Sequence, residues 1–237
     1  MSSMQAQEPL PSVLVVTTED VDVSKRAYER FLGIDAGGPL AVDNAMIELC
    51  GGSSQTTPHR ALFGTRDLAA TTRLLRRRGL ALTETAPGRA EADAESSVGV
   101  IKAPQLAPAA GSELIAVDHL VFNAAVRDSA VALFGATLGM DFRLEQSIHE
   151  EIHQLFFRAP AMVVEVVVGR GDPGSATSTS ATTLWGIAWR STDIELTHRR
   201  LVAADVEVSE MRTGRKPGTR VFSVRDRALG LPTLVID

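Results

Sequence analysis

Hydrophobic and polar positions follow the same order in two long segments of the chain. Residues 13–33 read VLVVTTEDVDVSKRAYERFLG, and residues 119–139 read HLVFNAAVRDSAVALFGATLG. Each segment begins as a short apolar strand, passes through a polar turn and continues as an amphipathic helix. Each ends on Leu-Gly at the same distance from its strand. We expect Gly33 and Gly139 to terminate the helices, because glycine tolerates the left-handed conformation of a helix C-terminus.

Two further segments repeat this order in shorter form. Residues 61–79 and 187–205 each contain a strand, an acidic N-cap and a helix, and the N-caps are Asp67 and Asp193. After the last helix come three strand candidates, VEVSEMR, TRVFSVRD and LPTLVID. The pattern therefore predicts repeated units in which a strand and a helix are followed by more strands.

The repeat predicts an α+β fold built from four strand–helix–strand–strand–strand units. The second unit is the least clear, because residues 86–97 read APGRAEADAESS and are loop-like. The expected units lie near residues 12–52, 60–104, 116–169 and 183–237.

Composition narrows the class of protein without naming a chemistry. The 237 residues include 24 Lys and Arg against 29 Asp and Glu, a net charge of −5, with 44% hydrophobic residues. We therefore expect a globular protein that binds neither nucleic acid nor membrane. The amino end has no secretory pattern and Cys50 is the single cysteine, which together favour the cytoplasm and exclude an internal disulfide. A small molecule is the expected partner, and the chain is expected to be a monomer or a homodimer.

The third unit opens on Asp-His-Leu-Val at residues 118–121, and with the paired repeats this resembles the vicinal oxygen chelate superfamily. That superfamily includes glyoxalase I, extradiol dioxygenases, and the fosfomycin and bleomycin resistance proteins. The resemblance implies two tandem glyoxalase-like domains, residues 1–113 and 114–237. Each domain would pair two units into an incompletely closed barrel around a pocket. The first domain is expected to be degenerate and the second to hold the functional site.

The resemblance also implies metal ligands early in the first strand and on the fourth strand of a unit. Because alternate strand residues point to opposite faces, His119, Val121 and Asn123 would face the pocket. Glu165, in the apolar run MVVEVVV, would share that face and needs a partner if it is buried ionised. His119 is the expected partner, and His153 is a third candidate ligand. The set predicts a divalent ion, Zn, Ni, Mn or Fe, and the alternative is a metal-free hydrogen-bonded or general-base pair.

Other positions of the expected ligand ring carry no donor. The same register puts Gly186 and Leu234 (or Thr233) at ligand positions of the fourth unit, and Val13 at the histidine position of the first. No pairing of units then assembles the two-histidine, one-carboxylate set of an extradiol dioxygenase or the four ligands of glyoxalase I. Both of those activities are disfavoured.

The remaining candidates concern ligand binding. Arg190 is expected on the pocket face, where it needs a ligand anion or a nearby acid as counter-charge. Arg215 and Lys216, in a glycine- and base-rich stretch, could meet an anionic ligand, although a solvated hairpin is the simpler account. Val121, Asn123, Arg190 and Lys216 are the predicted substrate-binding residues, and His119 and Glu165 the catalytic ones. Two functions stay open: a lyase or isomerase acting on an oxygenated metabolite, and a metal-free protein that sequesters a drug or metabolite.

Overall fold

The computed structural model describes residues 9–93, 96–107, 111–149, 152–169 and 181–237. The helices are α1 (Val21–Leu32), α2 (Leu68–Arg77), α3 (Arg127–Ala130), which continues as the π-helix η1 (Val131–Thr137), α4 (Ile194–Ala203) and the 3₁₀ turn η2 (Arg227–Leu229).

The first half of the chain forms a seven-stranded sheet in the order β2-β3-β1-β4-β7-β6-β5. Its strands β1 and β4 pair antiparallel at the centre, so two units meet there. The strands are β1 (Ser12–Thr18), β2 (Ala41–Val42), β3 (Ala45–Gly51), β4 (Arg60–Thr65), β5 (Thr83–Ala86), β6 (Arg89–Glu91) and β7 (Val98–Lys102).

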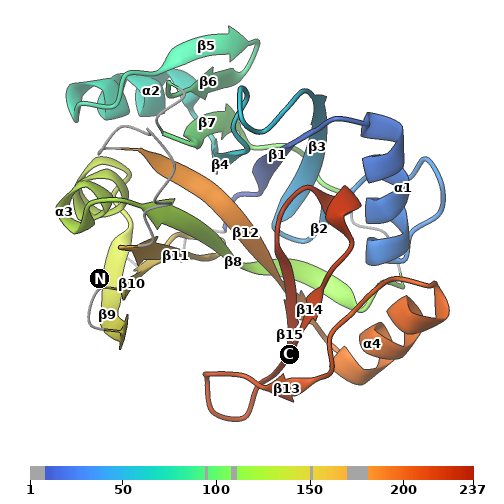
Figure 1. Cartoon of the computed structure of the whole chain (residues 1–237). Helices are drawn as coiled ribbons and strands as arrows, with labels where there is room; N and C mark the ends of the chain where they lie inside the picture. The colour runs from blue at the N-terminus through green and yellow to red at the C-terminus, as the bar shows by residue number, and fades with distance from the viewer. Residues whose placement is uncertain (1–8, 94–95, 108–110, 150–151, 170–180) are drawn as a thin grey trace, which may run out of the picture.

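The second half forms an eight-stranded sheet in the order β13-β14-β15-β12-β8-β11-β10-β9. Here β8 and β12 lie side by side at the centre, with one unit on each flank (Figure 1). The strands are β8 (Leu114–Ala124), β9 (Asp141–His149), β10 (Ile152–Arg158), β11 (Val163–Val168), β12 (Thr182–Ser191), β13 (Arg212–Thr213), β14 (Arg220–Val224) and β15 (Thr233–Ile236).

The α+β fold class and the tandem arrangement are confirmed, and both sheets are curved without closing into barrels. The helix signals are confirmed as well. The side chains of Asp67 and Asp193 accept from the backbone N–H of the third residue that follows each. Gly33 ends α1 with φ 69° and its N–H bonds back to the carbonyls of Glu29 and Arg30, as a left-handed C-cap does.

Three details differ from the expected units. The described part of the first unit has two strands after its helix, not three. Within the loop-like residues 86–97, the end of β5 and all of β6 form a hairpin around Gly88, whose φ is 79°. VEVSEMR contributes only an isolated bridge, Val208 to Val224, and the start of β13. Each difference involves strands of a few residues, for which periodicity gives little signal.

One hydrophobic core joins the two sheets and the helices between them. It contains Leu14 and Val16 of β1 together with Leu120 and Phe122 of β8. Phe31 of α1 packs edge-to-face on Trp189 of β12, with ring centroids 5.3 Å apart. The opposite face of the first sheet carries a smaller cluster of Val13, Val15 and Leu62, and that of the second sheet carries His119 and Glu165. No helix in the described residues is long and apolar enough to cross a membrane.

Polar contacts reinforce the junction between the halves. The buried hydroxyl of Tyr28 donates to the carbonyl of Leu229 at 2.9 Å. The Asn44 side chain donates to the carbonyls of Val117 and Ala161 and accepts from the Val117 N–H. The two halves are therefore held by satisfied buried hydrogen bonds as well as by apolar packing.

Candidate functional site

The face of the second sheet opposite the core brings His119 and Glu165 together. Parallel pairing sets Val121 of β8 opposite Glu165 of β11 and His119 opposite Val163. The Nε2 of His119 lies 3.6 Å from Oε2 of Glu165, and the two side chains are 18% and 12% exposed. The predicted pair is thus assembled by strand register, and the carboxylate stands beside the imidazole instead of alone among valines.

Asp118 holds the other side of the imidazole. Its Oδ2 lies 2.9 Å from Nδ1 of His119, while its Oδ1 accepts from Nη2 of Arg190 at 2.7 Å and from Nε at 3.1 Å. These contacts, that to His119 first, lower the pKa of Asp118 from 3.8 to about 2 although burial opposes the shift. An ionised carboxylate only accepts hydrogen bonds, so the proton on Nδ1 of His119 points to Asp118.

A β-bulge explains how neighbouring residues can face each other. In the β8–β12 pairing His119 stands opposite Ala188 and Val117 opposite Trp189, so Asp118 is the extra residue. A bulge re-aims the side chain that it carries. A second register shift, between Leu184 and Gly186, leaves Trp185 39% exposed. Trp185 therefore lies outside the core, although strict alternation would put it on the same face as Trp189, which is buried in the core.

Gln154 of β10 holds the far oxygen of Glu165. Its Nε2 donates a short hydrogen bond to Oε1 of Glu165. Its Oε1 accepts from Nε2 of Gln146 at 2.8 Å and from Nη1 of Arg215 at 2.7 Å. Because two donors fix the amide oxygen, the amide nitrogen must face Glu165. One carboxylate oxygen is thus occupied, and Oε2 is the one beside His119.

The predicted substrate-binding residues fall into two groups. Val121 and Asn123 lie on the same face as His119, and the buried Oδ1 of Asn123 has no hydrogen-bond partner among the described residues. A buried, unpaired amide oxygen is costly, which favours a ligand or water there. Arg190 is paired with Asp118, so its counter-charge is a nearby acid of the protein and not a ligand anion. Lys216 is exposed on the turn before β14, and the contact from that turn to the site comes from Arg215.

His153 does not join the pair. It stands opposite Val168, whereas Phe156 stands opposite Glu165, so His153 and Glu165 are on opposite faces of the sheet. The Nδ1 of His153 instead lies 3.6 Å from Oε1 of Glu145, on the side of α3. The set of His119, His153 and Glu165 is therefore not assembled.

The donor set does not fit the divalent ion that the resemblance implied. In the described residues no group of three or more His, Cys, Asp or Glu side chains could hold a metal. Oε1 of Glu165 is engaged by Gln154, and both oxygens of Asp118 are engaged by His119 and Arg190. Gly186 and Leu234 offer no side-chain donor. Two free donors fall short of the three or four protein ligands of ordinary transition-metal sites.

The equivalent face of the first sheet is filled by its own ion pairs. Glu48 stands opposite Val15 as Glu165 stands opposite Val121, but Val13 takes the histidine position. Nη1 of Arg89 lies 2.6 Å from Oε1 of Glu48, and Arg89 also pairs with Glu91. An arginine thus neutralises the carboxylate that faces a histidine in the second sheet.

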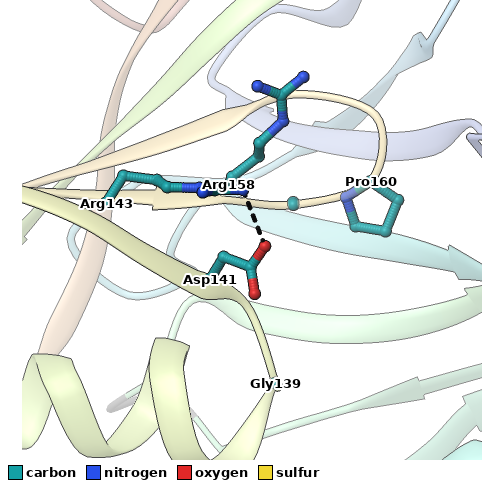
Figure 2. Close-up of a pocket in the computed structure, with 6 residues that line it drawn as sticks. Gly139, Asp141, Arg143, Arg158 and Pro160 are labelled. Carbon is teal, nitrogen blue, oxygen red and sulfur yellow. Dashed lines mark hydrogen bonds and ion pairs between the residues drawn. The ribbon is translucent and has the colours of Figure 1, made fainter.

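An open pocket of about 240 Å³ lies away from the pair, at one end of β9 and β10. Figure 2 shows Asp141 and Arg143 joined by an ion pair, 3.0 Å between Oδ2 and Nη2, and Arg158 turned away from them. Both members of the ion pair are more than half exposed. The pocket contains no histidine and no buried carboxylate, so it does not compete with the His119–Glu165 site.

Sequence reasoning missed Asp118 and Gln154, and it named Arg215 as a candidate for an anionic ligand without its contact to Gln154. Asp118 adjoins His119 in the chain, but alternation alone assigns it to the opposite face. The register of Gln154 against Glu165 depends on the length of the β10–β11 turn, and Arg215 reaches across from another unit. Of these residues, only Gln154 could have been found from the sequence, because it is a polar residue within the otherwise apolar strand segment QLFF.

Fold and site together define a tandem α+β protein with one His–Glu site in its second half. Residues 118–222 match the model of the Glyoxalase/Bleomycin resistance protein/Dioxygenase superfamily, in line with the resemblance seen in the sequence. No protein of curated function matches the chain in sequence.

A solved structure supports the same architecture. A mutant of 4-hydroxymandelate synthase from Streptomyces coelicolor is similar over 97% of this chain and 92% of its own, with a TM-score of 0.69 and 11% identity. Methylmalonyl-CoA epimerase from Mycobacterium tuberculosis is similar over 54% of this chain and 91% of its own, with a TM-score of 0.44 and 20% identity. At such identities the likeness to 4-hydroxymandelate synthase shows the fold alone.

Proposed function

We propose that the second half of the chain, residues 114–237, is an enzyme domain that moves a proton on a small oxygenated molecule, in an isomerase- or lyase-type reaction. The observation that carries the proposal is the geometry of the pair. Nε2 of His119 and Oε2 of Glu165 are 3.6 Å apart, and each is held from behind by a dedicated partner. Two titratable groups so positioned can reach neighbouring atoms of one small carbonyl compound.

The contacts assign a role to each group. Oε2 of Glu165 takes a proton from the carbon next to a carbonyl, and the electron pair of the C–H bond forms an enolate. In the protonated ring Nε2–H of His119 donates to the enolate oxygen. Return of a proton from Glu165 to the same carbon exchanges its hydrogen with solvent. In an α-hydroxycarbonyl compound the hydroxyl proton passes to the former carbonyl oxygen through the enediol, and return of the carbon-bound proton to the former carbonyl carbon isomerises the compound. Asp118 keeps the ring oriented, as an acid behind a catalytic histidine does.

Partial burial supports this chemistry. Glu165 is 12% exposed and Gln154 is 5% exposed, so the pair is largely shielded from water on the sheet side. Electrostatic interactions are stronger where water is excluded.

A second candidate function is sequestration of a small molecule without chemistry. Gly186 and Leu234 favour sequestration. They occupy positions at which a metal-binding member would carry ligands, but they have no donor atoms and give this face of the sheet an apolar surface. Under this alternative Glu165 and His119 would only bind the ligand. The two functions differ in whether substitution of Glu165 by its uncharged isostere stops a reaction or only changes an affinity.

The test is solvent deuterium exchange at carbons next to carbonyls, followed by proton NMR with a panel of 2-oxo acids and hydroxyketones. The wild-type protein should exchange at least one compound, and Glu165→Gln should lower that rate by about 100-fold or more. Glu48→Gln is the matched control, since Glu48 occupies the equivalent strand position of the first sheet. If compounds bind but none exchanges, the protein sequesters a small molecule and the enzyme proposal is wrong. Exchange that persists in Glu165→Gln would remove Glu165 from the reaction.

A further inference from the structure

The turn between β13 and β14 presents Arg215 to the site. The Gly214 N–H donates to the Thr219 carbonyl at 2.8 Å, and the Thr219 hydroxyl donates to the Lys216 carbonyl at 2.7 Å. Gly218 adopts φ 82°, and a Cβ on Gly214 would lie 2.3 Å from the Thr219 hydroxyl oxygen. The turn is therefore closed by its own backbone and needs glycine at both places. Arg215 extends from it to Gln154, the residue that holds Glu165.

The charge of Arg215 has no protein counter-ion in the described part of the chain. Its one contact there is with the amide oxygen of Gln154, which carries no net charge. Three other arginines of the second half are paired with carboxylates, Arg127 with Glu145, Arg190 with Asp118 and Arg220 with Asp237. Arg212 of the same hairpin has no carboxylate partner among the described residues either, but only Arg215 contacts Gln154. A guanidinium offers five donors in a planar fork that matches a carboxylate or phosphate. One donor of Arg215 is used, and its charge is left for a ligand.

The position of this charge is fixed relative to the reacting groups. One amide group and two hydrogen bonds separate the guanidinium of Arg215 from Oε1 of Glu165. A ligand anion on Arg215 therefore lies within a few bonds of the carbon whose proton Glu165 removes. Arg190 cannot serve in its place, because Asp118 already engages both its Nε and Nη2.

We propose that Arg215 binds an anionic group of the substrate, so that the substrate class is small carbonyl compounds bearing a carboxylate or phosphate. This inference rests on the proposed function and extends it to the identity of the substrate. The anion on Arg215 orients the carbonyl so that its oxygen meets His119 and its neighbouring C–H meets Glu165. Uncharged carbonyl compounds of the same shape lack this anchor.

Two matched pairs of probes test the inference and separate the two anions. The first pair is 2-oxobutanoate and 2-oxobutanamide, and the second is dihydroxyacetone phosphate and dihydroxyacetone. Solvent deuterium exchange is measured for the wild-type protein and for Arg215→Met, Arg215→Lys and Arg212→Met. Arg212 lies on the same hairpin and is exposed, so its substitution removes an equal charge as a control. Calorimetric binding of each anion is measured on the same proteins.

In the wild-type protein the anionic member of at least one pair should react with kcat/KM about tenfold or more above its neutral partner. That preference should disappear in Arg215→Met, return in part in Arg215→Lys, and persist in Arg212→Met. Equal rates within both pairs, or a preference that survives Arg215→Met, would overturn the inference and leave the proton-transfer proposal standing. Absence of exchange with every probe would count against the proposed function. Binding then decides the inference: anion affinity that falls in Arg215→Met supports it, and unchanged or undetectable affinity overturns it.

Discussion

Replacement of Asp118 by asparagine tests the support of the catalytic histidine. The substitution keeps the shape of the side chain but removes the charge that faces His119 and Arg190. Folding lowers the pKa of Asp118 from 3.8 to about 2, and each unit of such a shift corresponds to about 1.4 kcal/mol. The ionised carboxylate therefore stabilises the fold by about 2 kcal/mol at neutral pH. With a side chain that is 26% exposed, little of this is lost to solvent screening.

The sign of the pH dependence follows from the direction of the shift. Because the folded pKa is depressed, the stabilisation is complete above about pH 4 and is lost as the pH falls toward 2. Urea unfolding of the wild-type protein and Asp118→Asn should differ by about 2 kcal/mol at pH 7, and the difference should shrink below pH 4. Asp128→Asn is the control, since Asp128 forms an exposed ion pair with Arg127 and should cost about 0.5 kcal/mol or less. A difference that stays constant from pH 7 to pH 2.5, or is absent at pH 7, would refute the reasoning.

Three other substitutions probe separate parts of the structure. Gln154→Leu should lower the kcat of proton exchange by about tenfold or more, because Oε1 of Glu165 loses its donor. An unchanged kcat would show that Gln154 does not position Glu165. Tyr28→Phe should lower the free energy of unfolding by about 1–2 kcal/mol, since the carbonyl of Leu229 stays buried without its donor; calorimetry with no fall in Tm would contradict that role. Arg89→Met should cost about 1–2 kcal/mol in chemical unfolding, because Glu48 loses its arginine while Glu91 keeps Arg60, yet leave proton exchange intact. A loss of exchange beyond the loss of folded protein would place the first sheet in the reaction.

The sequence predicted the fold where the signals were periodic and local. Strand alternation placed Leu120 and Phe122 in the core and His119 on the opposite face, and the aspartates at positions 67 and 193 marked the starts of two helices. The pairing of His119 with Glu165 followed from the same alternation, because both residues lie in regular parts of neighbouring strands.

The remaining features depend on departures from regular structure. Alternation of polar and apolar residues cannot predict the bulge at Asp118. The extra residue of a bulge redirects its side chain toward the other face of the sheet, and the sequence carries no mark of it. The same limit explains the exposed Trp185. His153 was a candidate ligand because the register across the β10–β11 turn was unknown, and the observed register puts it on the other face. The contact between Arg215 and Gln154 joins residues 61 positions apart and depends on the tertiary fold.

The central claim is that His119 and Glu165 act as one unit, and a double-mutant cycle on the proton-exchange rate tests it most directly. The cycle compares the wild-type protein, His119→Asn, Glu165→Gln and the double variant with the best exchanging probe. Groups that act together are strongly non-additive, so each single substitution should lower the rate by about 100-fold or more and the double variant should be no slower than the worse single one. Effects that multiply in the double variant, or a His119→Asn protein that exchanges at the wild-type rate, would contradict the account.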